Sequence, residues 1–260
     1  MSSNLYTDKS GIKTSVESAL RAALMVIERG GSTAMADNTF KNIISKCDVS
    51  DVSVMWRLDN VILGYTIDGQ TTTVLRPVGG IGTDLTGVSK VIELSEDVAE
   101  GKTDISDVNS ELEKISKLPP VHTNWTLILV AALAAAFYSK FHYGAIGSIA
   151  VVFIAALIGQ TLRLKLKSKK VKDGQITLIC GLLSAGITSM ALQLGFGKLD
   201  MPIMIASVIY MVPGLLMING FVDLTKQRFI FIGMQRLLNA TFLFIILAVV
   251  ILTTYTFIKF

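Results

Sequence analysis

Long stretches in the second half of the chain carry almost no charge, and this feature restricts the fold more than any other. Within residues 121–162 the only charged side chain is Lys140, and within residues 174–222 there are only Lys198 and Asp200. A helix needs about 20 mostly apolar residues to cross a bilayer, and other backbone conformations leave polar groups without partners in lipid. The sequence therefore predicts an α-helical membrane protein. We expect five transmembrane helices, at residues 123–141, 144–162, 175–196, 202–222 and 237–258.

The two halves of the chain differ in charge. Residues 1–120 hold 12 Lys and Arg against 17 Asp and Glu, whereas residues 121–260 hold 12 against 3. The net charge of +4 and the isoelectric point near 9.0 are therefore averages over an acidic half and a basic half. This distribution excludes a single soluble domain and a disordered chain, and we expect no nucleic-acid partner. Two cysteines are too few for a disulfide scaffold.

The basic residues also predict an orientation. The segment 163–172 between the second and third expected spans carries six cations, and the segment between the fourth and fifth carries Lys226, Arg228 and Arg236. The opposite side has only three. The positive-inside rule places the two basic loops in the cytoplasm. We therefore expect a multi-pass protein of the bacterial inner membrane, with a cytoplasmic N-terminus and the C-terminus outside.

The first half of the chain changes periodicity several times, which is typical of a small α/β domain. Apolar residues recur at helical spacing first, and Thr33 is placed to cap a second helix. Alternating residues then predict strands, with a hairpin turn at Asp68-Gly69. We expect helices near 16–27, 33–44, 84–100 and 108–115 and strands near 52–57, 61–67 and 72–76. The predicted domains are a cytosolic α/β domain at 1–118, a proline-containing linker at 119–122 and a transmembrane domain at 123–260.

The expected cytosolic domain has no recognisable catalytic motif. No histidine precedes His122, and the sequence has neither a Walker-type glycine loop nor a Cys/His spacing suited to metal. Its carboxylates are scattered singly, as on a solvated surface. We therefore expect no enzyme activity, no catalytic residues, no cofactor and no metal site.

Three segments carry a resemblance to a known family. They are GGSTAMADNTF at Gly30–Phe40, GVSKVIELSEDVAEGK at Gly87–Lys102 and YMVPGLLMINGFVDL at Tyr210–Leu224. Together with the order of a small α/β domain, a proline linker and five spans, they resemble the threonine/serine exporter (ThrE) family. The match is most specific in the third segment, and Gly233 and Arg236 follow where the family has a glycine and an arginine. The resemblance covers nearly the whole chain.

The resemblance implies a function and partners. Long members of the family fuse this unit to a second membrane block, whereas this chain is similar to the short half that works with a separate, smaller membrane subunit. It implies an efflux transporter subunit, driven by the proton motive force, that exports threonine and serine or a succinate-like dicarboxylate. Homo- or hetero-oligomers are expected. Two alternatives remain at this point: a membrane-tethered cytosolic sensor or hydrolase, and a passive pore.

The fourth expected span holds the first group of candidate transport residues. Pro213-Gly214 interrupts an apolar segment, where proline removes a backbone donor and predicts a kink or an unwound turn. Such a break either presents backbone groups to a substrate or is a structural bend. Asn219 is expected within the span. Asp223 is expected at its cytoplasmic end, where it is either interfacial or able to carry a coupling proton.

The third and fifth expected spans supply the second group. Ser184, Thr188 and Gln193 have side chains that can hydrogen-bond a carboxylate or an amine, although close helix packing also explains small polar residues at this spacing. Arg236, at the mouth of the fifth span, can attract a carboxylate from the cytoplasm. Its alternative role is topological, as one of the nine inside cations.

Overall fold

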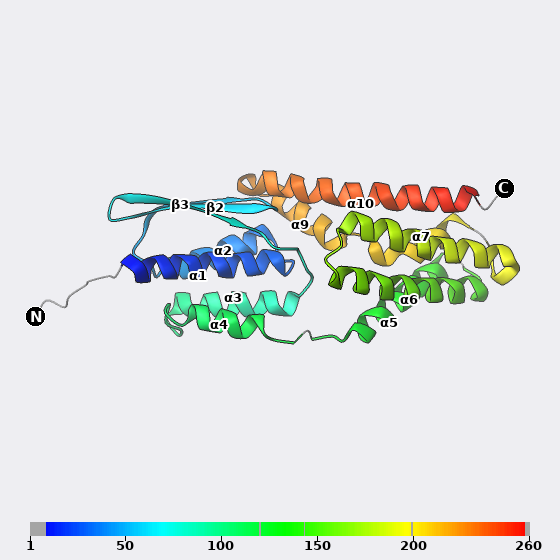
Figure 1. Ribbon diagram of the computed structural model, residues 1–260, viewed down its shortest axis with the longest axis horizontal. Coiled ribbons are helices and arrows are strands. Elements are labelled where there is room, and N and C mark those ends of the chain that lie inside the picture. The colour runs from blue at the N-terminus through cyan, green and yellow to red at the C-terminus, as the bar shows by residue number, and fades with distance from the viewer. Residues whose placement is uncertain (1–8, 120, 143, 199, 258–260) are drawn as a thin grey trace, which may run out of the picture. The chain divides into compact units, whose positions relative to one another are not determined.

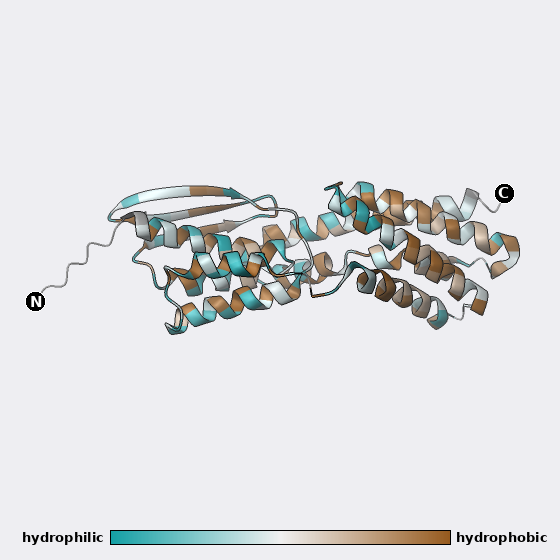
Figure 2. Cartoon of the chain, turned by 60° about the horizontal axis from the view of Figure 1, so that its bottom comes forward, coloured by the Kyte–Doolittle hydropathy of each residue, from teal (hydrophilic) through white to brown (hydrophobic). Residues whose placement is uncertain are grey.

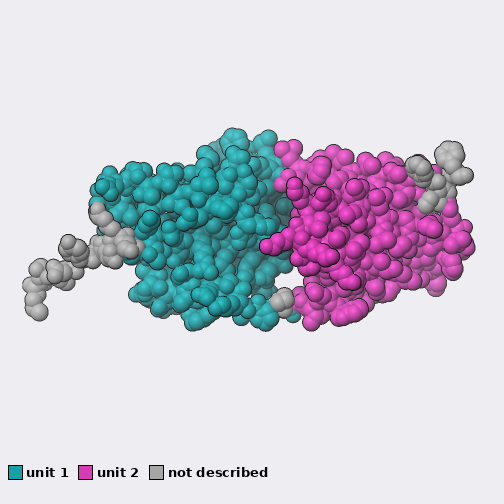
Figure 3. Space-filling model, viewed as in Figure 1, with its two compact units in different colours: residues 1–121, 215–237 teal, residues 122–214, 238–260 magenta. Residues whose placement is uncertain are grey.

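The computed structural model describes residues 9–119, 121–142, 144–198 and 200–257, and it divides into two compact units (Figure 3). The first unit comprises residues 1–121 and 215–237, and the second comprises residues 122–214 and 238–260. Pro120, within the expected linker, and residue 258, at the end of the last expected span, lie outside the described residues. A segment from late in the sequence thus belongs to the N-terminal unit.

The first unit combines an antiparallel sheet with helices. Figure 1 shows α1 and α2 between the sheet on one side and α3 and α4 on the other. Its elements are α1 (Lys9–Glu28), α2 (Thr33–Ile44), β1 (Ser50–Trp56), β2 (Asn60–Ile67), β3 (Gln70–Pro77), α3 (Leu85–Glu100), α4 (Val108–Ser116), α9 (Gly214–Leu224), η3 (Gln227–Phe229) and the beginning of α10 (Ile230–Phe257).

The sheet has the order β1-β2-β3, and β2 provides most of its buried side chains. Val61, Leu63 and Tyr65 alternate along β2 and pack into the same core as the helices. The predicted hairpin is confirmed, because Ile67 pairs with Gln70 across the turn. Both turn residues, Asp68 and Gly69, have positive φ, as a tight two-residue hairpin turn requires.

The start of α2 corrects one sequence expectation. Ser32, and not Thr33, is the capping residue, because its Oγ accepts a hydrogen bond from the backbone N–H of Met35 at 3.3 Å. Thr33 is already the first helical residue, and its hydroxyl points to a different partner, described below. The hydroxyls of Ser32 and Thr33 are both able to cap a helix, but only the extended backbone of Ser32 places its side chain over the helix end.

The second unit consists of helices whose outer surfaces are apolar. Figure 2 shows mostly hydrophobic colour along these helices, whereas the helices of the first unit mix both colours. Buried alanines and other small residues on α5 and α6 let these two helices pack together. The elements are α5 (Asn124–Phe141), α6 (Ile146–Ser168), α7 (Asp173–Ala191), the π-helical turn η1 (Leu192–Phe196), α8 (Met201–Val208), η2 (Ile209–Met211) and the remainder of α10.

The helical membrane architecture predicted from hydropathy is found in the described residues. Four of their helical segments are each long and apolar enough to cross a bilayer, and these are residues 124–141, 146–168, 173–196 and 227–256. The expected fourth span is instead a pair of helices, Met201–Met211 and Gly214–Leu224, bent by 74°. The number of crossings is five when this bent pair counts as one. The break falls at the predicted Pro213-Gly214 position.

Candidate functional site

Helix α9 buries its polar face and exposes its apolar face, the reverse of a helix in a water-soluble protein. Asn219 and Asp223 are spaced four residues apart, so they share one face, and both are buried. Ile218 and Phe221 point outward and are 63% and 56% exposed. The burial of a carboxylate and an amide requires polar partners, because an unpaired buried charge is costly. Two other segments of the first unit supply those partners.

The first partner is Arg236 on α10. Its Nε lies 3.2 Å from Oδ2 of Asp223, and the two side chains are 1% and 0% exposed. Gly233, one turn earlier on α10, allows this approach, because a Cβ there would lie 3.0 Å from backbone atoms of α9. The result is a fully buried ion pair between α9 and α10.

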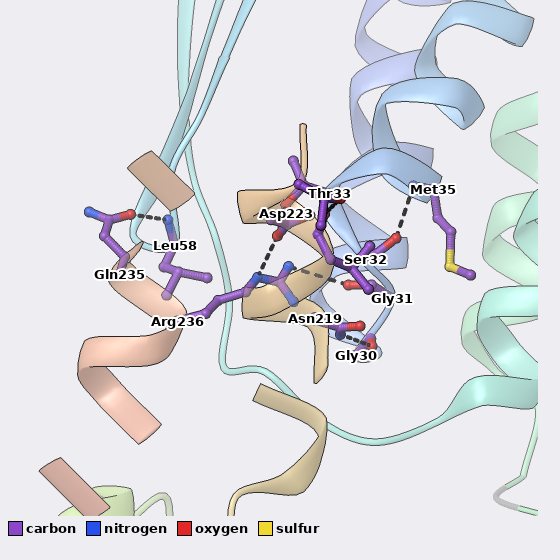
Figure 4. Close-up of polar contacts among 12 residues, drawn as sticks. Gly30, Gly31, Ser32, Thr33, Met35, Leu58, Asn219, Asp223, Gln235 and Arg236 are labelled. Atoms are coloured by element: carbon purple, nitrogen blue, oxygen red, sulfur yellow. Dashed lines mark hydrogen bonds and ion pairs between the residues drawn. The ribbon is translucent and has the colours of Figure 1, made fainter. Parts of the chain in front are cut away.

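The second partner is the loop that joins α1 to α2, together with Thr33 at the start of α2 (Figure 4). Thr33 Oγ1 donates a hydrogen bond to Asp223 Oδ2 at 2.7 Å. Asn219 Nδ2 donates to the carbonyl of Gly30 at 2.9 Å, and Arg236 Nη2 donates to the carbonyl of Gly31 at 3.3 Å. We call these six residues the Asp223–Arg236 cluster. Asp223 Oδ1 has no hydrogen-bond partner among the described residues.

A second contact ties residues 215–237 to the N-terminal part of the first unit. Asp37 on α2 is buried and accepts a hydrogen bond from Trp56 Nε1 at 3.1 Å. It also pairs with Lys41 at 2.7 Å and with Arg228 at 3.4 Å. Arg228 is half exposed, so this pair is screened more strongly than the Asp223–Arg236 pair.

The second unit contains its own polar cluster. Ser184 Oγ on α7 donates to the carbonyl of Ala155 at 3.1 Å and lies 2.9 Å from the Tyr210 hydroxyl. Arg163 Nη1 donates to the carbonyl of Tyr210 at 2.7 Å. Gly159 provides the space for this arrangement, because a Cβ there would lie 2.0 Å from the Tyr210 hydroxyl and 2.1 Å from Ser184 Oγ. We call Gly159, Arg163, Ser184 and Tyr210 the Tyr210 cluster.

The remaining predicted site residues have different settings. Thr188, one turn after Ser184 on α7, is fully buried and its hydroxyl has no partner among the described residues. Gln193 lies exposed on η1. Pro213 lies in the break between η2 and α9, and Gly214 begins α9. The Gly214 N–H donates to the carbonyl of Val212 at 2.8 Å and not to that of Tyr210. The eight predicted residues are divided between the two units, with Asn219, Asp223 and Arg236 in the first and the other five in the second.

Sequence reasoning did not identify Arg163 and Tyr210 as site residues. The sequence pattern marks Arg163 only as one of six cations in the segment 163–172, and Tyr210 only as part of a motif. A usable signal was present, because Ala155, Gly159 and Arg163 recur every four residues and thus share one face of α6. The part of the chain that the structure describes has no group of three or more His, Cys, Asp or Glu residues placed to hold a metal ion.

Comparisons with known proteins identify the family. The sequence profile described as "Putative threonine/serine exporter" (ThrE) matches residues 17–258. A Klebsiella aerogenes protein, "Probable succinate transporter subunit YjjP", is 22% identical over 223 residues, which is 85% of this chain and 86% of that protein. The Escherichia coli protein of the same name is 21% identical over 209 residues, 80% of each chain. No solved structure matches. Because the profile covers nearly the whole sequence, the chain belongs to the threonine/serine exporter family.

Proposed function

We propose that this chain is the larger subunit of an inner-membrane efflux transporter that exports a small carboxylate. The substrate is a hydroxy-amino acid such as threonine or serine, or a succinate-like dicarboxylate. A second, smaller multi-pass membrane subunit completes the transporter, and the proton motive force drives it. The N-terminus is cytoplasmic and the C-terminus lies outside. The family and the word "subunit" in the names of both relatives support this proposal.

The observation that carries the proposal is the broken helix pair at Val212-Pro213. Charged and polar groups are rare inside membrane spans, and those present commonly mark substrate pathways. Transporters use interrupted helices to present backbone and side-chain groups to polar substrates. Here the break lies next to a guanidinium and two hydroxyls of the Tyr210 cluster, inside a helical unit with an apolar outer surface. A purely structural anchor has no need of such groups.

The Asp223–Arg236 cluster is the proposed coupling element. As long as Asp223 is ionised, it holds Arg236 and Thr33 together. A proton on Asp223 removes the charge that Arg236 faces, and this weakens the contact between α9, α10 and the α1–α2 loop. Proton uptake would then change the packing around α9, which follows directly after the break. Asn219 orients the same loop through the Gly30 carbonyl.

One observation favours the alternative function of a cytosolic sensor. A cavity of about 210 Å³ in the first unit is lined by residues of α1, β3 and α4, among them Arg21 and Arg76. Glu17 also lines this cavity and pairs with Arg76 at 3.3 Å, so the walls of the cavity carry both signs of charge and suit a small polar molecule. A sensor needs no transport, so an efflux experiment separates the two functions.

The test is efflux from cells that express the chain together with the small multi-pass membrane subunit that the proposal requires. Cells are loaded with labelled serine, threonine or succinate, and external label is followed with and without an uncoupler. The proposal predicts efflux of at least one substrate that stops when the uncoupler is added. Efflux that continues at the same rate in the presence of the uncoupler would show a passive pore. The absence of efflux would favour the sensor.

Within the same assay, Pro213→Ala is expected to reduce efflux at least about tenfold, a change of about 1.4 kcal/mol in the transport barrier. The substitution restores a backbone donor and lets a helix continue through the break. Pro202→Ala is the matched control, because Pro202 lies in the first turn of α8, where proline is tolerated. The amount of each variant in the membrane is measured by immunoblot. Equal efflux from the two variants would refute a role for the break.

A further inference from the structure

The second unit has a surplus of positive charge and an arginine without a carboxylate partner. Residues 122–214 and 238–260 contain nine Lys and Arg but only two acids, Asp173 and Asp200. Among the described residues, Arg163 forms no ion pair, and the one hydrogen bond described for it goes to the Tyr210 carbonyl. A guanidinium has five N–H donors in a planar fork. Most of this binding capacity is therefore unused.

Arg163 differs from its neighbours in the basic segment 163–172. The other five cations of this segment are exposed, as expected for residues that only fix topology. Arg163 is half buried and directs its guanidinium to the broken helix. Its position on α6, one turn after Gly159, places it on the face that contacts the Tyr210 cluster.

The helix break explains why a carbonyl is available to this arginine. In a continuous helix the Gly214 N–H would bond to the Tyr210 carbonyl, four residues earlier. In the structure that N–H bonds to Val212 instead, so the Tyr210 carbonyl is left for Arg163. A neutral carbonyl is a weaker partner for a guanidinium than a carboxylate, which accepts two parallel hydrogen bonds.

The side chain of Tyr210 brings two hydroxyl groups, its own and that of Ser184, close to Arg163. Its phenol oxygen meets Ser184 beside Gly159, which lies about 6 Å along α6 from Arg163, at 1.5 Å per residue. Thr188, on the same face of α7 as Ser184, is fully buried and its hydroxyl has no partner among the described residues. An unpaired buried hydroxyl costs stability, and a state of the protein in which it binds a ligand would account for its presence.

We propose that Arg163 binds the carboxylate of the transported substrate, and that the Ser184 and Tyr210 hydroxyls bind its second polar group. In this view the guanidinium of Arg163 binds the Tyr210 carbonyl when no substrate is present, and the substrate carboxylate displaces this carbonyl. The ligand class is a small carboxylate with a second hydrogen-bonding group a few ångströms away. A dicarboxylate and a hydroxy-amino acid both meet this description, and a plain fatty acid does not. The inference rests on the proposed function and assigns a binding site to it.

Binding to the purified full-length chain tests the proposal. Equilibrium dialysis with labelled succinate, serine and butyrate is carried out on wild type, Arg163→Gln, Arg163→Lys and Lys165→Gln. We expect succinate or serine, but not butyrate, to bind to wild type. Arg163→Gln should weaken binding by about 10-fold to 100-fold, the usual range for losing a charge-assisted bidentate contact. Arg163→Lys should retain part of the affinity, because it keeps the charge but loses the fork.

Lys165→Gln is the matched control, since it removes a cation of the same segment that is exposed. It should bind within about twofold of wild type, because an exposed charge contributes little. Equal affinities for Arg163→Gln and Lys165→Gln would overturn the inference, as would the absence of binding to wild type. Neither result bears on the proposed function, because the efflux assay tests that function separately. Arg163→Lys keeps the test valid if Arg163→Gln does not fold.

Discussion

Replacing Arg236 by methionine is expected to destabilise the first unit by about 3–5 kcal/mol, the usual cost of removing one partner of a buried ion pair. Asp223 would remain fully buried with its charge, held only by the Thr33 hydroxyl. Trp56 is a suitable reporter, because it is buried in this unit and the chain has only one other tryptophan. In a Trp125→Phe background, its fluorescence during denaturant unfolding measures the loss.

The chain offers a matched control for this experiment. Arg228→Gln removes an arginine that also pairs with a buried aspartate, Asp37, but Arg228 is half exposed and Lys41 remains. Its cost should be about 0–1 kcal/mol. The double variant Asp223→Leu/Arg236→Met should recover much of the loss, because an apolar pair needs no desolvation of charge. If Arg236→Met costs no more than Arg228→Gln, the Asp223–Arg236 cluster does not hold α9 to the rest of the first unit.

The second large effect is expected at Gly159. An alanine Cβ would lie 2.0 Å from the Tyr210 hydroxyl and 2.1 Å from Ser184 Oγ, so both groups must move and their hydrogen bond is lost. Overpacking of this kind costs about 1–3 kcal/mol. If the Tyr210 cluster forms the pathway, efflux from cells expressing Gly159→Ala should fall at least about tenfold, since a displaced polar group no longer meets the substrate.

Gly186→Ala, on α7, is the comparison variant, because a Cβ there meets nothing within 4 Å. Alanine is also a better helix former than glycine by about 1 kcal/mol. Gly186→Ala should therefore show full efflux and equal or higher stability. Full efflux from Gly159→Ala would contradict the assignment of the pathway to this cluster.

The features that the sequence predicted well depend on local chemistry. Hydropathy located four helical segments, because each crossing has to be apolar over its own length, although the last one begins at residue 227 and not at residue 237. Proline located the helix break at 212–213, because the missing donor acts within one turn. The hairpin at Asp68-Gly69 follows from the same kind of short-range rule.

The features that it did not predict depend on contacts between distant residues. Thr33 and Asp223 are 190 positions apart, and no local pattern indicates that they meet. From hydropathy, Asp223 is expected at the cytoplasmic end of a span, whereas its partners allow complete burial in the first unit. Arg163 was overlooked for a related reason, since counting loop cations ignores the face on which each one lies. A helical-face analysis of α6 would have separated it from the others.

Counterflow in proteoliposomes tests the central claim, that this chain is the exporting subunit for a small carboxylate, most directly. Vesicles containing both subunits are loaded with unlabelled serine, threonine or succinate, and uptake of the same labelled compound is measured. The account predicts labelled uptake with at least one of the three, no uptake from vesicles with the smaller subunit alone, and a strong reduction with Pro213→Ala. Equal uptake by vesicles with and without this chain would contradict it.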